Sequence, residues 1–279
     1  MIPPEPDTAL LERLDRAEGV RLFLDYDGTL ADFAPTPDHV SPDQELVDLL
    51  SQVVDHPRIQ AAIISGRRLG HIQRLVPVEG ILLAGTYGVE IQTPQGERLD
   101  RLDYHTVRPT LEKLKPLWAD LVEGRDGFYL EDKNWALALH ARFADPAESD
   151  CVLGAARQLA RDAIRSGPPD VFRLLGGDRF LEIGPQLAHK GRTVDYLLES
   201  RPWPGAIPLY LGDDDKDEEA FDVIQAHHGL AIVVTPAPRE TQADYRLQSP
   251  QAARRWLRRL LVHLGSAREA PSGAPASRS

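Results

Sequence analysis

The stretch RLFLDYDGTLADF, residues Arg21–Phe33, places two acids where a buried strand should end. Residues 22–24 are all apolar, which is typical of a strand covered on both faces of a parallel sheet. Asp25 and Asp27 follow one residue apart, and the dipeptide Gly28-Thr29 continues the turn. Two carboxylates at the exit of a hydrophobic strand indicate a site for chemistry at that edge of the sheet.

Further short apolar runs predict more buried strands, with helical patterns between them. The runs are IQAAIIS (59–65), GILLAGT (80–86), PLYLGDD (208–214) and LAIVV (230–234). One helix is predicted from SPDQELVDLLSQVV, with Ser41 as N-cap and Gln44 completing a capping box. Another is predicted to follow Ser249. Alternating strands and helices predict an α/β fold with a doubly wound, Rossmann-like parallel sheet.

The middle of the chain has a different pattern, from about Tyr104 to Pro185. It predicts the order α-β-β-α-β-β, an antiparallel α+β domain inserted into the α/β one. Its first helix is expected to be kinked or interrupted at Pro116. We therefore expect a discontinuous core domain, an inserted cap domain and a disordered tail, spanning residues 1–103 with 186–265, 104–185 and 266–279 respectively.

The composition narrows the class of protein. Among 279 residues, 43 acids outnumber 32 lysines and arginines, for a formal charge of -11. Binding to a nucleic-acid backbone needs a basic face, so we expect no nucleic-acid partner, although a small anionic substrate remains compatible. One cysteine allows no intramolecular disulfide, and no apolar run approaches the ~18 residues of a membrane span. With no apolar signal segment near the start, we expect a cytoplasmic protein without a membrane partner, and a monomer.

Polar groups follow the predicted strands where their carboxyl ends should meet. Ser65 ends the second strand, Lys190 begins a helix after the inserted domain, and Asp213 opens an acidic run after PLYLG. Each has an ordinary structural explanation: a turn acid, a helix cap, or acids that stabilise a helix N-terminus. Together with Asp25 and Asp27, in this order, they predict a phosphoryl-transfer site.

The chemistry assigns a separate task to each group. Asp25 attacks phosphorus and forms an aspartyl-phosphate, and Asp27 protonates the leaving oxygen and then activates water. Magnesium, held by the Asp25 and Asp213 side chains and the Asp27 carbonyl, offsets the repulsion between carboxylate and phosphate. Gly28 lets the backbone approach the phosphate, Ser65 donates a hydrogen bond and Lys190 supplies positive charge.

These four motifs resemble those of the haloacid dehalogenase superfamily of aspartate-dependent phosphatases. The motifs are DYDGTL (25–30), the Ser65 strand end, Lys190 and GDD (212–214), and the insertion resembles that superfamily's larger α+β cap. The resemblance implies that Asp214 and Asp217 support the metal ligands. It also implies phosphate contacts from the two turns and the lysine, namely Gly28, Thr29, Ser65, Gly66, Arg67 and Lys190.

More narrowly, the chain resembles the trehalose-6-phosphate phosphatase family in LDYDGTLADFAPTPDHV, SGR, GTYGVEI, LEDKNWALALHAR and GDDDKDEEAF. The resemblance implies a magnesium-dependent hydrolase that releases phosphate from trehalose 6-phosphate, in the last step of trehalose biosynthesis. It also implies sugar contacts from four residues of the inserted domain, Glu131, Lys133, His140 and Arg142. Cross-strand ion pairs that stabilise the sheet are the structural alternative for these four.

Two positions depart from the family pattern. Lys216 occupies a place where the family usually has threonine, which predicts weaker magnesium binding unless the ammonium turns away from the metal. Gly184 stands where the family often has arginine. Two other functions remain open: a capped phosphatase for another sugar phosphate, such as sucrose phosphate or mannosylglycerate phosphate, and a catalytically silent sugar-phosphate-binding module.

Overall fold

The computed structural model describes residues 3–32, 41–177 and 179–266, within two compact units. The first unit comprises Met1–Ala62 and Leu197–Ser279, and the second comprises Ile63–Tyr196. This division does not follow the expected domain boundaries at 103 and 185, which stay predictions. The predicted disordered tail lies outside the described residues, apart from its first residue, which ends the last helix.

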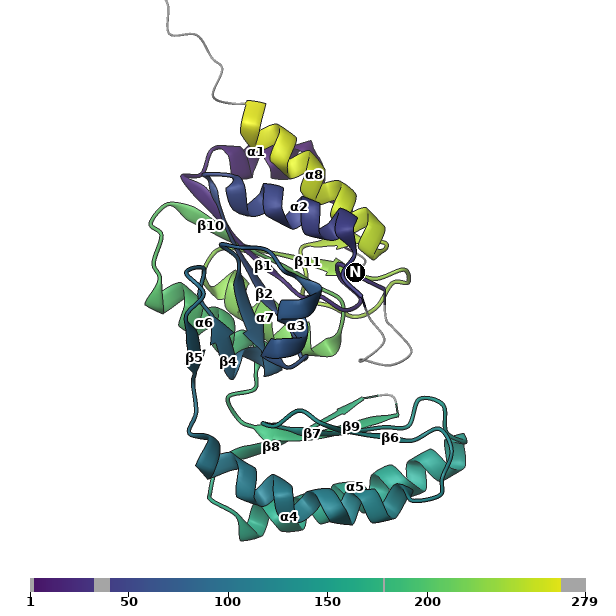
Figure 1. Cartoon of the computed structure of the whole chain (residues 1–279). Helices are drawn as coiled ribbons and strands as arrows, with labels where there is room; N and C mark the ends of the chain where they lie inside the picture. The colour runs from purple at the N-terminus through teal and green to yellow at the C-terminus, as the bar shows by residue number, and fades with distance from the viewer. Residues whose placement is uncertain (1–2, 33–40, 178, 267–279) are drawn as a thin grey trace, which may run out of the picture. The chain divides into compact units, whose positions relative to one another are not determined.

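Parallel strands form the core of the first unit (Figure 1). β1 (Gly19–Leu24), β10 (Ala206–Gly212), β11 (Leu230–Val234) and β12 (Tyr245–Leu247) are hydrogen-bonded in the order β12-β11-β10-β1, each pair parallel. β2 (Ile59–Ile64) follows β1 in this order. Every residue of β1 and β11 is buried, as the continuous apolar runs predict.

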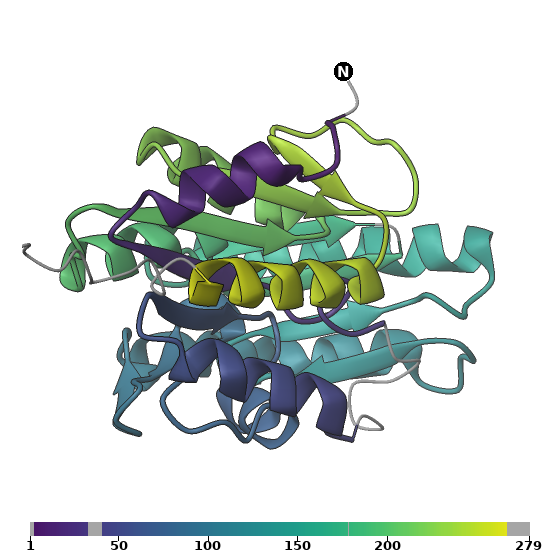
Figure 2. The same ribbon diagram turned by 90° about the horizontal axis from the view of Figure 1, so that it is seen from above.

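The helices of this unit pack around that sheet. α8 (Pro250–Ser266) packs against both α1 (Thr8–Asp15) and α2 (Gln44–Asp55), and Figures 1 and 2 show it between them. α7 (Asp215–Ala226) packs on β10 and β11. In the part of the chain that the structure describes, no helix has the length and apolar content needed to cross a bilayer.

The predicted N-cap of α2 at Ser41, with Gln44 completing a capping box, is wrong. The helix is capped by Asp43, whose Oδ1 accepts from the backbone N–H groups of Glu45 (3.0 Å) and Leu46 (3.3 Å). Arg254 of α8 also donates to Asp43, at 2.5 Å, and this hydrogen bond lowers the pKa of the Asp43 carboxyl. A tertiary contact therefore selects the cap, and a local pattern does not reveal it. Ser249 caps α8 as expected, accepting from Ala252 N–H at 3.1 Å.

The second unit begins with the end of β2. It includes β3 (Leu82–Gly85), which the run GILLAGT predicted, and a hairpin of β4 (Glu90–Gln92) and β5 (Arg98–Asp100), which the sequence analysis did not predict. α3 (Leu69–Leu75) leads to β3, and the 3-10 turn η2 (Thr86–Gly88) lies between β3 and β4. β3-β4 and β4-β5 are antiparallel pairs. β4 and β5 have three residues each, too short to show a clear alternating pattern.

The same unit contains the predicted α-β-β-α-β-β order. It runs α4 (Tyr104–Val122), β6 (Tyr129–Asp132), β7 (Leu137–His140), α5 (Pro146–Ser166), β8 (Phe172–Gly177) and β9 (Phe180–Pro185). The four strands form an antiparallel sheet in the order β6-β7-β9-β8. α6 (Lys190–Ser200) follows and crosses the boundary between the units.

The expected interruption of the first of these helices at Pro116 does not occur. α4 continues through both Pro109 and Pro116, because its buried side chains anchor it on either side. Trp118 is fully buried and donates its Nε1–H to the carbonyl of Ala156 on α5 (3.0 Å). Leu139 and Leu181 of the sheet lie in the same apolar cluster as Trp118. This packing outweighs the hydrogen bonds that the two prolines cannot make.

Candidate active site

Three carboxylates gather at the ends of β1 and β10 in the first unit. Asp25 follows β1, Asp213 follows β10, and Asp217 lies in the first turn of α7. One carboxylate oxygen from each lies within 4.8 Å of those of the other two. The pairing of Leu24 with Leu211 and the bond from Asp25 N–H to Leu211 O (2.9 Å) bring the two strand ends together.

The turn after β1 is held by its own backbone. Gly28 has a φ of 81°, a left-handed conformation that suits glycine, and its N–H donates to Ala31 O at 2.7 Å. Thr29 is fully buried, and its hydroxyl donates to Asp25 Oδ2 at 3.2 Å and lies 3.4 Å from Asp213 Oδ1. Asp27 lies half-buried in the same turn. The Thr29 side chain therefore orients the carboxylates, which its predicted role in phosphate binding did not include.

Asp217 is fixed by hydrogen bonds to both of its oxygens. Tyr210 donates to Oδ1 at 2.7 Å, and the N–H groups of Asp213 and Asp214 donate to Oδ2 at 3.0 and 3.1 Å. Asp217 is fully buried, and a Cβ at Gly212 would lie 2.2 Å from its carboxyl carbon. This geometry agrees with a supporting role for Asp217, and Tyr210 is a partner that the sequence analysis missed.

Asp214 supports the same loop as the N-cap of α7. Its Oδ1 accepts from Lys216 N–H (2.9 Å) and Asp217 N–H (3.2 Å), forming a capping box. The Lys216 ammonium lies 3.2 Å from Asp214 Oδ2. The helix is therefore capped by Asp214 without a threonine at position 216, and the positive charge of Lys216 faces a carboxylate.

The cluster of Asp25, Asp213 and Asp217 fits a metal ion. All of its donors are carboxylate oxygens, which hard cations such as magnesium and calcium prefer. Asp25 is buried and Asp213 is half-buried, so the carboxylates of both side chains are partly shielded from water. The residues present therefore suit a divalent cation.

In the second unit, the turn after β2 is built by backbone contacts with the segment Thr86–Tyr87. Ser65 is buried, its Oγ accepts from Arg67 N–H (3.1 Å), and its carbonyl accepts from Tyr87 N–H (2.8 Å). A Cβ at Gly66 would lie 2.7 Å from the Tyr87 hydroxyl oxygen, so only glycine leaves room for this ring. Arg67 Nη1 lies 3.2 Å from Nε2 of buried His71. The predicted phosphate-side residues Ser65, Gly66 and Arg67 thus share one ordered turn.

The segment that holds this turn is strained. Thr86 and Tyr87 have φ values of 48° and 55°, which non-glycine residues rarely adopt. Glu90 holds it in place, accepting from the Thr86 hydroxyl at 3.2 Å and from Leu69 N–H at 3.3 Å. Thr193 of α6 donates to Tyr87 O at 2.7 Å, and Lys190 is buried at the start of the same helix. The GTYGVE stretch therefore ties the Ser65 turn to the helix that carries Lys190.

The second predicted group of residues lies on the four-stranded sheet. Leu130, Leu139 and Leu181 pack toward α4 and α5, so their neighbours in each strand point to the opposite face, here called the open face. Glu131 is on this face, and its Oε2 lies 3.0 Å from His140 Nε2. The Lys133 ammonium donates to Oε2 of Glu182 at 2.7 Å. Lys133 is thus ion-paired with Glu182 and Glu131 is hydrogen-bonded to His140, while a sugar contact from either residue stays a prediction.

Burial and charge act in opposite directions on these groups. Burial alone would raise the pKa of Glu131, but the hydrogen bond from His140 and the charge of Lys133 outweigh it and lower that pKa. Burial alone would lower the pKa of Lys133, but the negative charge of Glu182 outweighs this effect and raises that pKa. Both groups are therefore charged at neutral pH.

Glu182 is a candidate site residue that the sequence analysis missed. It is fully buried, and among the described residues its Oε1 has no hydrogen-bond partner. A Cβ at Gly184 would lie 3.9 Å from this oxygen, so the departure from the family pattern at Gly184 is located beside it. A buried acceptor of this kind is costly unless a ligand group satisfies it.

Arg142 is not on the strand that carries His140. β7 ends at His140, and Arg142 lies two residues further on, exposed. The spacing of two residues would place Arg142 on the same face as His140 if the strand continued, but the chain leaves the sheet between them. A sugar contact from Arg142 stays a prediction.

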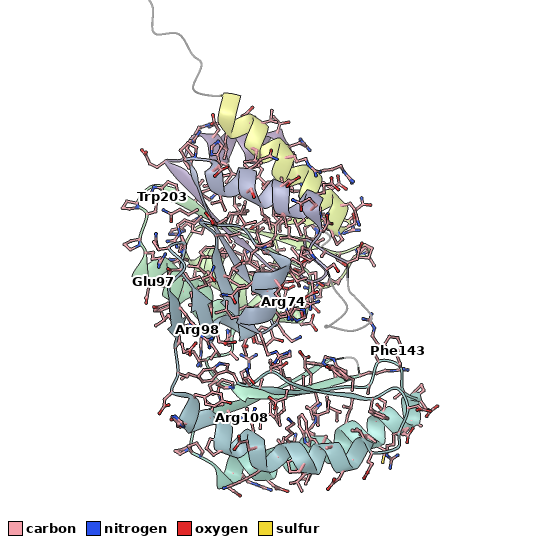
Figure 3. The ribbon with its side chains drawn as sticks, in the orientation of Figure 1. Arg74, Glu97, Arg98, Arg108, Phe143 and Trp203 are labelled. Atoms are coloured by element: carbon pink, nitrogen blue, oxygen red, sulfur yellow. The ribbon has the colours of Figure 1, made fainter. Side chains whose placement is uncertain are left out.

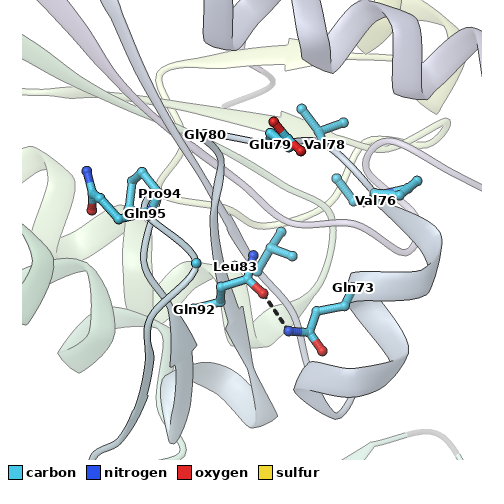
Figure 4. A pocket seen from close by; sticks show the side chains of 11 residues that line it. Gln73, Val76, Val78, Glu79, Gly80, Leu83, Gln92, Pro94 and Gln95 are labelled. Carbon is cyan, nitrogen blue, oxygen red and sulfur yellow. Dashed lines mark hydrogen bonds between the residues drawn. The ribbon is translucent and has the colours of Figure 1, made fainter.

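A separate cavity of about 500 Å³ lies in the second unit, between α3 and the β4–β5 hairpin (Figure 4). Gln73 donates to Gln92 Oε1 at 2.5 Å across it. None of the predicted site residues lines it, and its described lining includes no lysine, arginine or histidine. A cavity without a cation is unsuited to a phosphate, so it is not the predicted site.

Comparisons with known proteins agree with these motifs. The family model for trehalose-phosphatase matches residues 23–251. A trehalose-phosphate phosphatase of Mycobacterium avium (strain 104) is 31% identical over 272 residues, which cover 94% of this chain and 67% of that protein. The C. albicans trehalose-6-phosphate phosphatase C-terminal domain superposes with a TM-score of 0.80 at 22% identity, covering 93% of this chain and 98% of that one.

A more distant structure shares the fold. A haloacid dehalogenase-like hydrolase from Bacteroides thetaiotaomicron superposes with a TM-score of 0.59 at 15% identity, over 87% of this chain and 99% of that one. The likeness supports the α/β core with an α+β insertion that the motifs predicted. With the family model spanning most of its length, the chain belongs to the trehalose-phosphatase family.

Proposed function

We propose that the protein is a magnesium-dependent phosphatase that hydrolyses trehalose 6-phosphate to trehalose and phosphate. The observation that carries the proposal is the carboxylate cluster, in which Asp25, Asp213 and Asp217 meet at the ends of two paired parallel strands. Family membership supports the choice of substrate. Residues 104–185 act as the cap that selects the sugar, and the protein works as a cytoplasmic monomer.

The two acids of the first motif have consecutive roles. Asp25 attacks phosphorus, so that a bond from its carboxylate oxygen to phosphorus forms while the bond from phosphorus to the sugar oxygen breaks. Asp27 gives that leaving oxygen its proton. Asp27 then removes a proton from water as the water attacks phosphorus, which releases phosphate and regenerates Asp25.

Side-chain and backbone contacts prepare this chemistry. Thr29 and the β1–β10 pairing fix the Asp25 carboxylate, and Asp217 fixes the backbone that presents Asp213. Magnesium, held by Asp25, Asp213 and the Asp27 carbonyl, would supply positive charge to the phosphate oxygens. Ser65 and Lys190 bind those oxygens, with the turn of Gly66 and Arg67 donating further hydrogen bonds.

Recognition of the sugar belongs to the open face of the four-stranded sheet. Glu131 and Glu182 offer acceptors to hydroxyl groups, and Lys133 offers donors. The Lys133–Glu182 ion pair holds both side chains in fixed positions. Oε1 of Glu182 is the acceptor that a sugar hydroxyl would satisfy.

The direct test is phosphate release from trehalose 6-phosphate with and without magnesium, for wild type and Asp25→Asn. Sucrose 6-phosphate, glucose 6-phosphate and a small aryl phosphate complete the panel. We expect magnesium-dependent release, selective for trehalose 6-phosphate and abolished by Asp25→Asn. Release from another sugar phosphate alone would keep the mechanism and replace the substrate.

The role of the open face has a test of its own. Glu131→Ala should impair turnover of trehalose 6-phosphate while sparing the aryl phosphate, which has no sugar to recognise. Equal losses on both substrates would count against a sugar contact.

The silent sugar-phosphate-binding module is the second candidate. Its support is limited to Lys216, the departure from the family pattern in the metal loop, because all of the expected catalytic groups are present. A folded wild-type protein that binds trehalose 6-phosphate but releases phosphate from no member of the panel would favour it.

A further inference from the structure

We propose that Tyr129, His140 and Phe180 form an aromatic subsite that stacks against the glucose ring of trehalose 6-phosphate that carries no phosphate. The proposal rests on the function proposed above. These three residues are here called the aromatic row.

The aromatic row crosses three adjacent strands on the open face. Tyr129 of β6 is directly opposite His140 of β7, which is directly opposite Phe180 of β9. The ring centroids of Tyr129 and His140 are 5.8 Å apart, and those of His140 and Phe180 are 5.2 Å apart. The interplanar angles are 33° and 53°, so the three neighbouring rings are tilted against one another in a continuous strip.

The apolar core of this unit does not account for the aromatic row. The side chains that build the core from these strands, Leu130, Leu139 and Leu181, are the sequence neighbours on the other face. Tyr129 is 40% exposed, and the His140 side chain is 31% exposed. Exposed aromatic surface beside fixed polar groups is typical of a ligand site.

The polar groups that could bind a sugar lie two residues along the strands from the aromatic row, a spacing here called one repeat of the sheet. Glu131, Ala138 and Glu182 follow the aromatic row at a spacing of two residues on their strands, and they are also paired across the sheet. Ala138 lies between Glu131 and Glu182 on β7 and is small, so no larger side chain of that strand separates the two carboxylates. Since Glu131 also holds the His140 ring, at 3.0 Å, the acceptors and the aromatic row are parts of one surface.

The next repeat leads toward the phosphate-side turn. Lys133 pairs with Glu182, and its ammonium lies 5.8 Å from the centroid of the Tyr87 ring. Tyr87 donates its N–H to Ser65 O. The aromatic row is therefore about 13 Å along the sheet from the repeat nearest Ser65, which is two repeats of ~6.6 Å. A phosphate near Ser65 places the phosphorylated glucose near Lys133 and the second glucose near the aromatic row.

The chemistry of a pyranose suits this strip. Its ring faces carry C–H groups with partial positive charge, and aromatic faces carry the negative lobe of a quadrupole. Hydroxyls at the ring edge can then reach Glu131 and Glu182. The occupant is a glucose ring, because one face is apolar and the adjoining groups are hydrogen-bond acceptors.

The test replaces the rings and keeps apolar bulk. Tyr129→Leu and Phe180→Leu should each reduce kcat/KM for trehalose 6-phosphate about five- to tenfold, mainly through KM, since one stacked ring is lost. Activity on glucose 6-phosphate and on p-nitrophenyl phosphate should change less than about twofold, since neither reaches the aromatic row. Phe180→Tyr, which keeps an aromatic ring at this position, should have the wild-type KM.

Phe143→Leu is the matched control. Phe143 is an exposed aromatic residue, 68% accessible, beyond the end of β7 and outside the aromatic row (Figure 3). Unchanged KM for trehalose 6-phosphate in both leucine variants, or equal losses on all three substrates, would overturn the subsite. A wild-type protein that releases no phosphate from trehalose 6-phosphate would instead overturn the proposed function.

Discussion

The Tyr210 hydroxyl donates a 2.7 Å hydrogen bond to Oδ1 of Asp217, whose other oxygen accepts two backbone N–H groups of the acidic loop. A buried phenol of β10 thus sets the position of the loop that presents Asp213. The link joins the apolar core to the carboxylate cluster.

Removing this hydroxyl should loosen the loop. We expect Tyr210→Phe to lower the free energy of unfolding by about 1 to 2 kcal/mol and to raise the magnesium concentration needed for half-maximal activity about tenfold. Chemical denaturation and a magnesium titration of phosphate release measure the two effects. Tyr245→Phe, at a half-buried tyrosine of β12, is the control. A magnesium response identical to wild type would show that Asp217 does not depend on Tyr210.

Lys216 should matter less to magnesium than its charge suggests. Its ammonium lies 3.2 Å from Asp214 Oδ2, so a neighbouring carboxylate offsets its field, and Asp214 caps α7 without it. We expect Lys216→Thr to change the apparent magnesium affinity by less than about threefold. A gain of tenfold or more, seen in the same titration, would restore the sequence-based expectation that Lys216 weakens the metal site.

The contributions of the Lys133–Glu182 ion pair to stability and to sugar recognition should be separable by mutation. Lys133→Met leaves the Glu182 carboxylate buried without its counter-charge and should cost about 3 to 5 kcal/mol of stability. The double variant Lys133→Met/Glu182→Leu should recover to within about 1 kcal/mol of wild type, because it replaces the whole pair by apolar groups. Denaturant unfolding provides both values.

The same double variant should remain a poor enzyme for the disaccharide. Its activity on p-nitrophenyl phosphate should stay near that of wild type, and its activity on trehalose 6-phosphate should fall at least about a hundredfold, since acceptor and donor groups for hydroxyls are gone. Normal turnover of trehalose 6-phosphate by a stable double variant would assign the pair to structure alone.

Acid should destabilise the second unit through Asp132. Arg108, labelled in Figure 3, donates to both Asp132 oxygens at 2.7 and 2.8 Å, and Lys115 donates at 2.9 Å. Burial would raise the pKa of Asp132, but these hydrogen bonds outweigh it and hold the pKa well below its usual range. A carboxyl with a lowered pKa in the folded state stabilises the fold at neutral pH, and the contribution is lost as the pH falls below about 4.

Asp132→Asn should therefore be less stable by about 1 to 3 kcal/mol at pH 7, with a smaller decline in stability toward acid pH. Thermal unfolding between pH 3 and pH 7 measures both. Asp126→Asn, at an exposed carboxyl, is the control and should follow the wild-type curve. Parallel curves for Asp132→Asn and wild type would exclude Asp132 as a source of the acid sensitivity.

Features set by short stretches of sequence were predictable. The apolar runs predicted the positions of β1 and β10 to within three residues and that of β11 without error, and they led directly to Asp25 and Asp213. The cap order was also readable, because β6 with β7 and β8 with β9 are local hairpins.

Features that depend on pairing between distant segments were not predictable. Glu182 meets Lys133 only through the β7–β9 register, and Arg254 selects Asp43 as a cap from 211 residues away. Tyr210 reaches Asp217 because α7 folds back over β10. A single sequence contains no record of these contacts.

The unsatisfied Oε1 of Glu182 has a consequence for which sugars are refused. A sugar that brings a hydroxyl to this oxygen removes the free-energy cost of leaving a buried acceptor without a hydrogen bond. A deoxy analogue of the same shape leaves that cost in place. Discrimination between the two therefore exceeds the value of one ordinary hydrogen bond. The β7–β9 register, which fixes the position of Glu182, would thus cause a sugar that lacks this one hydroxyl to be rejected. No conformational change of the protein is needed for this discrimination.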